Sequence, residues 1–414
     1  MLKWGLDLGE VPMINKRQKT RTVILIIILV VAIIAGVFGA CYYMNGYTSP
    51  FDILSAEDEE EVEEVVEEPT LIIEEPEVEE ETEEEAQTEE VEEEIEEETT
   101  EPLLSGYGYF GALSVEDGRL VDSDGDTVIL AGVSSHGLSW YPEYVSADSI
   151  AYLKNYYGIN VVRLAVYTSD YNGYCVGGED IQSSIKDTID EAVCAAVDND
   201  MYIIIDWHIL NDSNPNTYKA EAIQFFGEMV RLYSDIDNVI YEICNEPNGD
   251  TTWDDIKSYA NEVIPVIRNV DSDAVILVGT PSYCSDLESV MADPLDFDNI
   301  MYTYHFYTTS HTVKARNHLM EALDEGLPVF ISEFGLSEAS GDGRLDTKEA
   351  SNWLELMYEY ELSGCVWSLC NKDETSSLIS ADCDKTTDYV YDDLSTSGKW
   401  LYDYMIEGDS SSEE

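Results

Sequence analysis

The stretch NVIYEICNEPNG (residues 238–249) places two polar residues, Asn245 and Glu246, directly after a run of apolar residues. The run has the length and composition of a buried strand. A carboxylate at the end of such a strand is costly to take out of water, so it either lies in open solvent or has a chemical task. The ends of the other apolar runs decide between these two possibilities.

Eight apolar runs of this kind recur along the chain, and amphipathic stretches with helical spacing separate them. They occupy residues 128–133, 160–167, 201–208, 238–246, 274–279, 300–307, 328–335 and 364–370. Continuous apolar runs are typical of parallel strands that are buried on both faces. Eight of them alternating with helices over about 300 residues predict an α/β fold, a (β/α)8 TIM barrel. An open, doubly wound sheet is the alternative, because the number of strands does not by itself close a barrel.

Polar and aromatic residues gather at the C-terminal ends of these runs. They are His136, Arg163, Asp206, His208, Asn245, Glu246, His305, Tyr307, Glu333 and Trp367. In a barrel all of those ends meet on one face, where active sites are assembled from different strands. We therefore expect Glu246 and Glu333 to face one shared pocket.

Two carboxylates in one pocket match the requirement of glycoside hydrolysis. One must keep its proton in order to protonate the leaving oxygen, and the other must be ionised in order to attack the anomeric carbon. Arg163 is suited to hold one of them ionised through charge and hydrogen bonding. A zinc site is the competing hypothesis for the histidines, but the chain has no H-x-x-x-H or C-x-x-C pair. The sequence therefore predicts no metal and no cofactor.

Residues 104–404 resemble the bacterial cellulases of glycoside hydrolase family 5, in the endoglucanase branch. The motifs that match, in the family's order, are LAGVSSHGLSWYPEYV, GINVVRLAVYT, MYIIIDWHIL, IYEICNEPNG, MYTYHFYTTSH, VFISEFGLSEASGDG and VWSLCNKDETSSLI. The resemblance implies a retaining endo-β-1,4-glucanase that cuts internal bonds of cellulose and related β-glucans by double displacement.

The resemblance also implies individual roles. Glu246 is the expected acid/base, and Glu333 is the expected nucleophile on an SEFG motif that replaces the family's commoner SEWG. Asn245 corresponds to the residue that hydrogen-bonds the sugar's 2-hydroxyl. The polar ring that positions and polarises the nucleophile corresponds to Arg163, His208, His305 and Tyr307.

Other residues match the family's sugar-binding positions. Trp367 corresponds to a platform for the apolar face of a pyranose ring, and its bond to Ser368 is expected to be cis. The subsites toward the non-reducing end are expected to involve His136, Trp140, Tyr141, Tyr167, Lys372 and Glu374, with a backbone contact at Ala339. A β-glucan chain is therefore the expected partner of this face.

Two alternative functions remain open on the residues alone. The same fold and mechanism would serve a glycanase that acts on mannan, xylan or mixed-linkage glucan, since pocket details set the substrate. A non-catalytic surface carbohydrate binder is less favoured, because it predicts damage to the catalytic pair. Both glutamates stand intact within their motifs.

The first 44 residues have the pattern of a membrane anchor. A basic leader, residues 1–22, precedes the uncharged segment 23–44, which as a helix is long enough to cross a bilayer. Positive flanks stay in the cytoplasm, so we expect a single-pass signal-anchor in the cell membrane and an extracellular catalytic domain. Cleavage with lipidation at Cys41, or secretion, is the alternative.

Residues 45–101 are expected to form an acidic, disordered linker. The tract 57–101 contains 26 Glu, one Asp and no Lys or Arg, and charges this dense cannot collapse around a core. A monomeric catalytic domain is expected at residues 102–408, followed by a disordered tail at 409–414. The formal net charge of −67 argues against nucleic acid as a partner.

Overall fold

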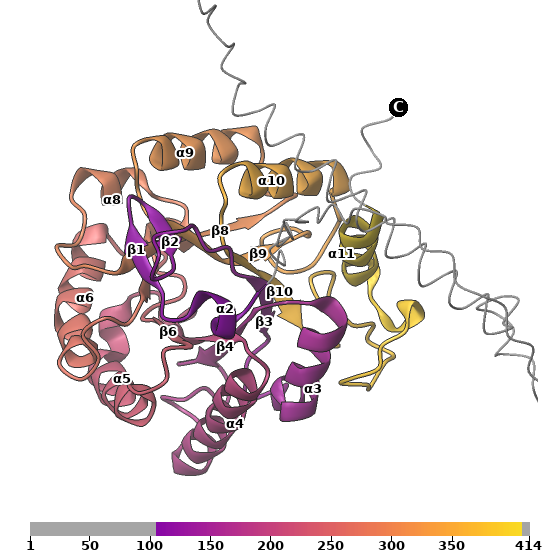
Figure 1. Cartoon of the computed structure of the whole chain (residues 1–414), viewed down its shortest axis with the longest axis horizontal. Coiled ribbons are helices and arrows are strands. Elements are labelled where there is room, and N and C mark those ends of the chain that lie inside the picture. The colour runs from indigo at the N-terminus through magenta and orange to yellow at the C-terminus, as the bar shows by residue number, and fades with distance from the viewer. Residues whose placement is uncertain (1–104, 408–414) are drawn as a thin grey trace, which may run out of the picture. The chain divides into compact units, whose positions relative to one another are not determined.

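A computed structural model describes residues 105–407, which form a closed barrel of eight parallel strands (Figure 1). The strands follow one another around the barrel in chain order, and the last pairs with the first to close it. They are β3 (Ala131–Ser135), β4 (Val161–Tyr167), β5 (Tyr202–His208), β6 (Val239–Glu242), β7 (Ile276–Val278), β8 (Ile300–Tyr307), β9 (Val329–Gly335) and β10 (Gly364–Leu369). The predicted barrel is confirmed, and the open-sheet alternative is wrong.

The ends of the strands lie within two residues of the predicted ends, except at two positions. β3 begins at Ala131 rather than at residue 128, because the N–H of Val128 bonds to the carbonyl of Leu120 outside the barrel. β6 ends at Glu242, four residues before Glu246. The backbone N–H of Glu246 still donates to the carbonyl of Ile209 at 3.3 Å, so the segment after β6 continues along β5 toward the mouth of the barrel.

Helices surround the barrel and alternate with its strands (Figure 1). The longer ones are α3 (Ala147–Tyr152), α4 (Glu179–Asp198), α5 (Lys219–Tyr233), α6 (Trp253–Arg268), α9 (Val313–Asp324), α10 (Thr347–Glu359) and α11 (Thr396–Glu407). Short helices are α2 (Tyr107–Phe110), α7 (Pro281–Cys284) and α8 (Glu288–Ala292). The start of α6 is fixed by a capping box between Thr252 and Asp255. Buried residues of α4 recur at helical spacing and face the barrel, as Ile185 and Ile189 do.

A small hairpin closes the N-terminal end of the barrel. Its antiparallel strands are β1 (Ser114–Glu116) and β2 (Arg119–Val121), and Figure 1 shows it lying across the barrel opening. Leu113 and Leu120 pack in one buried cluster with barrel residues such as Ile204 and Phe330. The hairpin therefore covers this end with apolar side chains, and the polar strand ends lie at the opposite face.

Several predicted segments lie outside the described residues. They are the leader (1–22), the signal-anchor (23–44), the acidic linker (45–101) and the tail (409–414). Within residues 105–407 no helix combines the length and the apolarity needed to cross a bilayer. The described residues fall inside the predicted catalytic domain, residues 102–408.

Candidate active site

One face of the barrel brings together the polar residues that end the predicted strands. They come from seven of the eight strands: His136 after β3, Arg163 and Tyr167 on β4, His208 on β5, Asn245 and Glu246 after β6, His305 and Tyr307 on β8, Glu333 on β9 and Trp367 on β10. All ten side chains are buried. Residues far apart in sequence thus form one compact site, as expected for the C-terminal face of a barrel.

Glu333 projects from β9 with both carboxylate oxygens engaged. Arg163 Nη1 lies 3.1 Å from its Oε2, and the Tyr307 hydroxyl donates to its Oε1 at 2.7 Å. A cation and a hydroxyl donor both favour the ionised form of a carboxyl group. Glu333 is therefore held as an oriented carboxylate, which is what a nucleophile aimed at one carbon atom requires.

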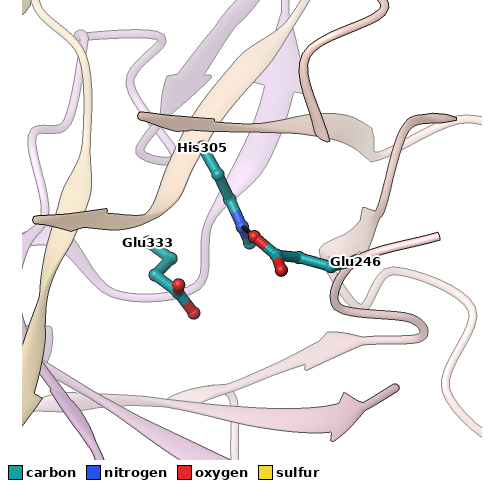
Figure 2. Close-up of side chains that lie close together, drawn as sticks. All are labelled: Glu246, His305 and Glu333. Carbon is teal, nitrogen blue, oxygen red and sulfur yellow. Dashed lines mark hydrogen bonds and ion pairs between the residues drawn. The ribbon is translucent and has the colours of Figure 1, made fainter. Parts of the chain in front are cut away.

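Glu246 faces Glu333 from a different environment (Figure 2). Its Oε1 lies 2.9 Å from Nδ1 of His305, and burial raises its pKa to about 7 against the opposing effect of Arg163. Burial also lowers the pKa of His305 to about 4, so the imidazole is neutral near pH 7. Oxygens of both glutamates and a ring nitrogen of His305 lie within 4.8 Å of one another. One carboxyl can thus hold a proton beside a second that is ionised.

Arg163 is fully buried and links three carboxyl groups. Its Nε and Nη2 lie 2.7 and 3.1 Å from the two oxygens of Glu242, and its Nη2 lies 3.0 Å from Asp206. Its third carboxyl partner is Glu333. Although burial opposes the charge, Asp206, Glu242 and Glu333 raise the pKa of Arg163 well above its usual value. The guanidinium is therefore a permanent cation that fixes the orientation of several groups at once.

Asn245 and His208 are oriented by the same network. Asn245 Oδ1 accepts a hydrogen bond from Arg163 Nη2 at 2.6 Å, and its Nδ2 lies 3.3 Å from His208 Nε2. On the other side of the ring, His208 Nδ1 lies 2.6 Å from Asp206 Oδ2. Burial lowers the pKa of His208 well below its usual value, so the ring is neutral. With its proton on Nδ1, His208 accepts from Asn245 and leaves the amide in one orientation.

Glu246, His305 and Glu333 also meet the distance requirement for a cation site within the described part of the chain. Their surroundings do not suit that role. Glu333 is already paired with a guanidinium and a hydroxyl donor, and a metal ion would lie beside the positive charge of Arg163. The group therefore fits proton transfer better than metal binding.

Trp367 forms the centre of an aromatic wall on this face. Its ring centroid lies 5.3 Å from that of His208 in a stacked arrangement and 5.1 Å from that of His136. The bond between Trp367 and Ser368 is cis, as the resemblance predicted. A flat ring held in this way offers a surface on which a pyranose can stack.

Three further aromatic residues extend the wall. The ring centroids of Trp140 and Tyr167 are 4.6 Å apart, and Tyr141 lies 5.3 Å from His136 in an edge-on arrangement. Trp140 and Tyr141 are partly exposed, whereas Tyr167 is buried. The wall therefore runs from the buried strand ends toward the rim of the barrel.

Lys372 and Glu374 lie next to this wall. Lys372 Nζ is 2.5 Å from one oxygen of Glu374, and His136 Nε2 is 3.6 Å from the other. Despite the opposing effect of burial, these two neighbours lower the pKa of Glu374 and keep it ionised. Ala339 is exposed, and its backbone N–H already donates to Ser310 Oγ at 2.9 Å, so a contact with a ligand would involve its carbonyl oxygen.

The structure adds two buried residues to the site that were not among the expected site residues. Glu242 contacts Arg163, and Ser332 donates to Glu242 Oε1 at 2.9 Å. The strand period of two carries a signal for Glu242, because it places this last residue of β6 on the same side of the strand as Ile240, which packs inside the barrel. Ser332 carries no such signal, since serine is common in every environment.

Comparisons with known proteins place the chain among cellulases. The family model for cellulase (glycosyl hydrolase family 5) matches residues 121–373. Endoglucanase A of Butyrivibrio fibrisolvens is 58% identical over 409 residues, which cover 95% of each chain. An endoglucanase of Clostridium saccharobutylicum is 44% identical over 292 residues, 70% of this chain and 64% of that one. The crystal structure of the catalytic domain of Thermobifida fusca endoglucanase Cel5A matches with a TM-score of 0.68 at 33% identity, over 72% of this chain and 98% of the other.

Proposed function

The chain belongs to the cellulases of glycosyl hydrolase family 5 and is an endo-β-1,4-glucanase, and we propose that it cleaves by double displacement with Glu333 as nucleophile and Glu246 as acid/base. The observation that carries the proposal is that two neighbouring carboxyl groups have different surroundings. Arg163 and Tyr307 present a cation and a hydroxyl donor to the two oxygens of Glu333, whereas burial against a neutral His305 lets Glu246 keep its proton.

The spacing of the two carboxyls supports retention of configuration. One oxygen of Glu246 and one of Glu333 lie within 4.8 Å of each other. Retaining enzymes place the two groups about 5–5.5 Å apart, whereas inverting enzymes leave about 6.5–9.5 Å for a water molecule between them. The short separation leaves Glu333 itself as the group that attacks the anomeric carbon.

The reaction then proceeds in two steps. In the first, Glu333 Oε bonds to the anomeric carbon while Glu246 gives its proton to the departing glycosidic oxygen. In the second, Glu246 takes a proton from water, whose oxygen displaces Glu333. Asn245 would donate to the sugar's 2-hydroxyl through its Nδ2, whose contact with His208 Nε2 is long at 3.3 Å.

Product analysis on several polysaccharides tests this function. The full chain is incubated with carboxymethylcellulose, mannan, xylan and mixed-linkage glucan, and reducing-sugar release and product anomers are followed by NMR. We expect a fast loss of carboxymethylcellulose viscosity with β-anomeric products. Activity confined to mannan or xylan would keep the mechanism and change the substrate, whereas α-anomeric products would exclude double displacement.

Glu246→Gln is expected to lower kcat/KM on cellotetraose by about 10²–10⁴-fold, because the leaving oxygen then receives no proton. The loss on 2,4-dinitrophenyl β-cellobioside should be far smaller, since that leaving group needs no protonation. In the wild type, activity on cellotetraose should fall as the pH rises above about 7, where Glu246 ionises. Equal losses on both substrates would contradict the acid role.

We further propose that residues 23–44 anchor the enzyme in the cell membrane and that residues 45–101 carry the barrel away from the outer surface. The charge pattern of the sequence supports this, and the similarity to the Butyrivibrio relative extends over 95% of the chain. We expect cellulase activity in the membrane fraction, and its release by protease from intact cells. Activity that stays in the soluble cell contents would contradict the proposal.

A further inference from the structure

A line of hydrogen bonds runs behind Glu246 to residues that take no part in the reaction described above. His305 Nδ1 lies 2.9 Å from Glu246 Oε1, His305 Nε2 lies 2.9 Å from Ser332 Oγ, and Ser332 lies 2.9 Å from Glu242 Oε1. We infer that Glu242 and Ser332 are positioning residues that fix the tautomer of His305 and so keep the proton on Glu246. This inference rests on the proposed acid/base role of Glu246.

The line begins at Glu242, whose pKa is raised by burial against the opposing effect of Arg163, so the geometry of its contact with that guanidinium indicates its charge. Arg163 Nε and Nη2 contact the two oxygens of Glu242 at 2.7 and 3.1 Å, and both side chains are fully buried. Such a two-point contact with a guanidinium is made by an ionised carboxylate. Glu242 is therefore an acceptor only and receives the hydroxyl proton of Ser332.

The proton count at Ser332 then decides the state of His305. A serine hydroxyl has one proton, and once that proton points to Glu242 the oxygen can only accept from the imidazole. His305 must therefore carry its proton on Nε2. Because burial keeps the ring neutral, Nδ1 is left as a bare lone pair that faces Glu246.

This lone pair favours one protonation state of Glu246. A protonated Glu246 donates to Nδ1 across the 2.9 Å contact, whereas an ionised Glu246 would place its own lone pairs against that of the nitrogen. The acid form is thus stabilised until the proton passes to the leaving oxygen. The same preference helps the carboxylate take a proton from water in the second step.

Other charged or titratable groups also face this pair from the surrounding elements. They are Arg163, Tyr167, Asp206, His208, Cys284, Tyr307, His311 and Glu333. None of them is altered by a substitution at Ser332. Replacing the hydroxyl of Ser332 therefore separates the effect of the His305 tautomer on Glu246 from the effect of the surrounding charges.

Ser332→Ala is the direct test, in the full chain. Without the serine acceptor, the proton of His305 is free to move to Nδ1 and to donate to ionised Glu246. The alkaline limb of kcat/KM on phenyl β-cellobioside should therefore move to lower pH by about one unit, the net strength of one hydrogen bond. The kcat/KM for 2,4-dinitrophenyl β-cellobioside should keep its pH profile, since its first step needs no acid.

The tautomer itself is read by NMR on protein labelled with ¹⁵N at histidine, with a His305→Gln spectrum to assign the signals. We expect Nε2–H in the wild type and Nδ1–H in Ser332→Ala. Ser332→Thr, which retains the hydroxyl, should show the wild-type tautomer of His305 and the wild-type alkaline limb of kcat/KM. Ser363→Ala is the matched control, because it removes a buried hydroxyl that bonds to Leu130 at the opposite end of the barrel.

Glu242→Gln provides a second route if the alanine variant does not fold. Its amide can donate to Ser332, which would turn the serine proton toward His305 and produce the same shift. If the alkaline limb of kcat/KM and the tautomer of His305 were unchanged in these variants, the inference would be overturned and the proposed function would stay intact. Full activity of Glu246→Gln on cellotetraose would instead overturn the proposed function.

Discussion

Glu333→Gln should lower the rate of reducing-sugar release from carboxymethylcellulose by at least about 10⁴-fold, the scale of loss seen when a covalent nucleophile is removed. The amide is close in size and shape to the carboxylate, but it has no charge with which to attack the anomeric carbon. It would also leave Arg163 with one fewer carboxylate partner. The expected result is a folded protein with almost no turnover.

The matched control for this substitution is Glu325→Gln, which removes an exposed carboxylate after the end of α9 and should leave the rate unchanged. A second variant, Glu333→Ala, tests the covalent step itself. With azide supplied and an activated aryl cellobioside as substrate, azide should attack from the vacated side and give the α-glycosyl azide by a single displacement. Near-normal turnover of Glu333→Gln would show that another group is the nucleophile.

Arg163→Met is expected to lower the free energy of unfolding by about 3–5 kcal/mol, because it removes the positive partner from a buried cluster of one guanidinium and three carboxyl groups. Asp206, Glu242 and Glu333 would remain buried without the guanidinium that now contacts all three. Urea unfolding, followed by tryptophan fluorescence, measures the loss. Arg119→Met is the control, since Arg119 pairs with Glu361 at an exposed position and such pairs contribute about 0–1 kcal/mol.

The loss caused by Arg163→Met should depend on pH. Burial already raises the folded-state pKa of Asp206 to about 8, and raises that of Glu242, against the opposing effect of Arg163, so without the cation both rise further above about 4, their value in the unfolded chain. An acid whose folded pKa is raised takes up a proton on folding, so stability falls as the pH rises from that value. The deficit relative to the wild type should therefore be larger at pH 8 than at pH 5. A deficit below about 1 kcal/mol at pH 8 would contradict the central role assigned to Arg163.

Much of the architecture is present in the sequence as local pattern. Runs such as residues 201–208 and 300–307 are mostly apolar along their whole length, and the structure has strands there with nearly the predicted bounds. At the start of β3, where prediction and structure differ, a hydrogen bond to another element is responsible. β3 starts late because Val128 pairs with Leu120, and the identity of that partner depends on how the hairpin folds back over the barrel.

The same division applies to the candidate site. A polar residue at the end of each strand predicts that Glu246 and Glu333 share a face, because parallel strands in a barrel place all their C-terminal ends together. The resemblance supplied their expected roles, which the substitutions above test. No local pattern gave Glu242 and Ser332 a place near His305, since the three residues lie on different strands.

The sequence by itself determined the eight strands and the carboxyl pair at their ends, because alternation along a strand fixes the face on which each side chain lies. Only the tertiary structure decided which side chains meet. Glu246 and His305 are 59 residues apart in the chain and 2.9 Å apart in space, and Ser332 reaches the same ring from a third strand. Those contacts depend on the closure of the barrel and on the relative shift of its strands, and both are set by packing across the whole domain.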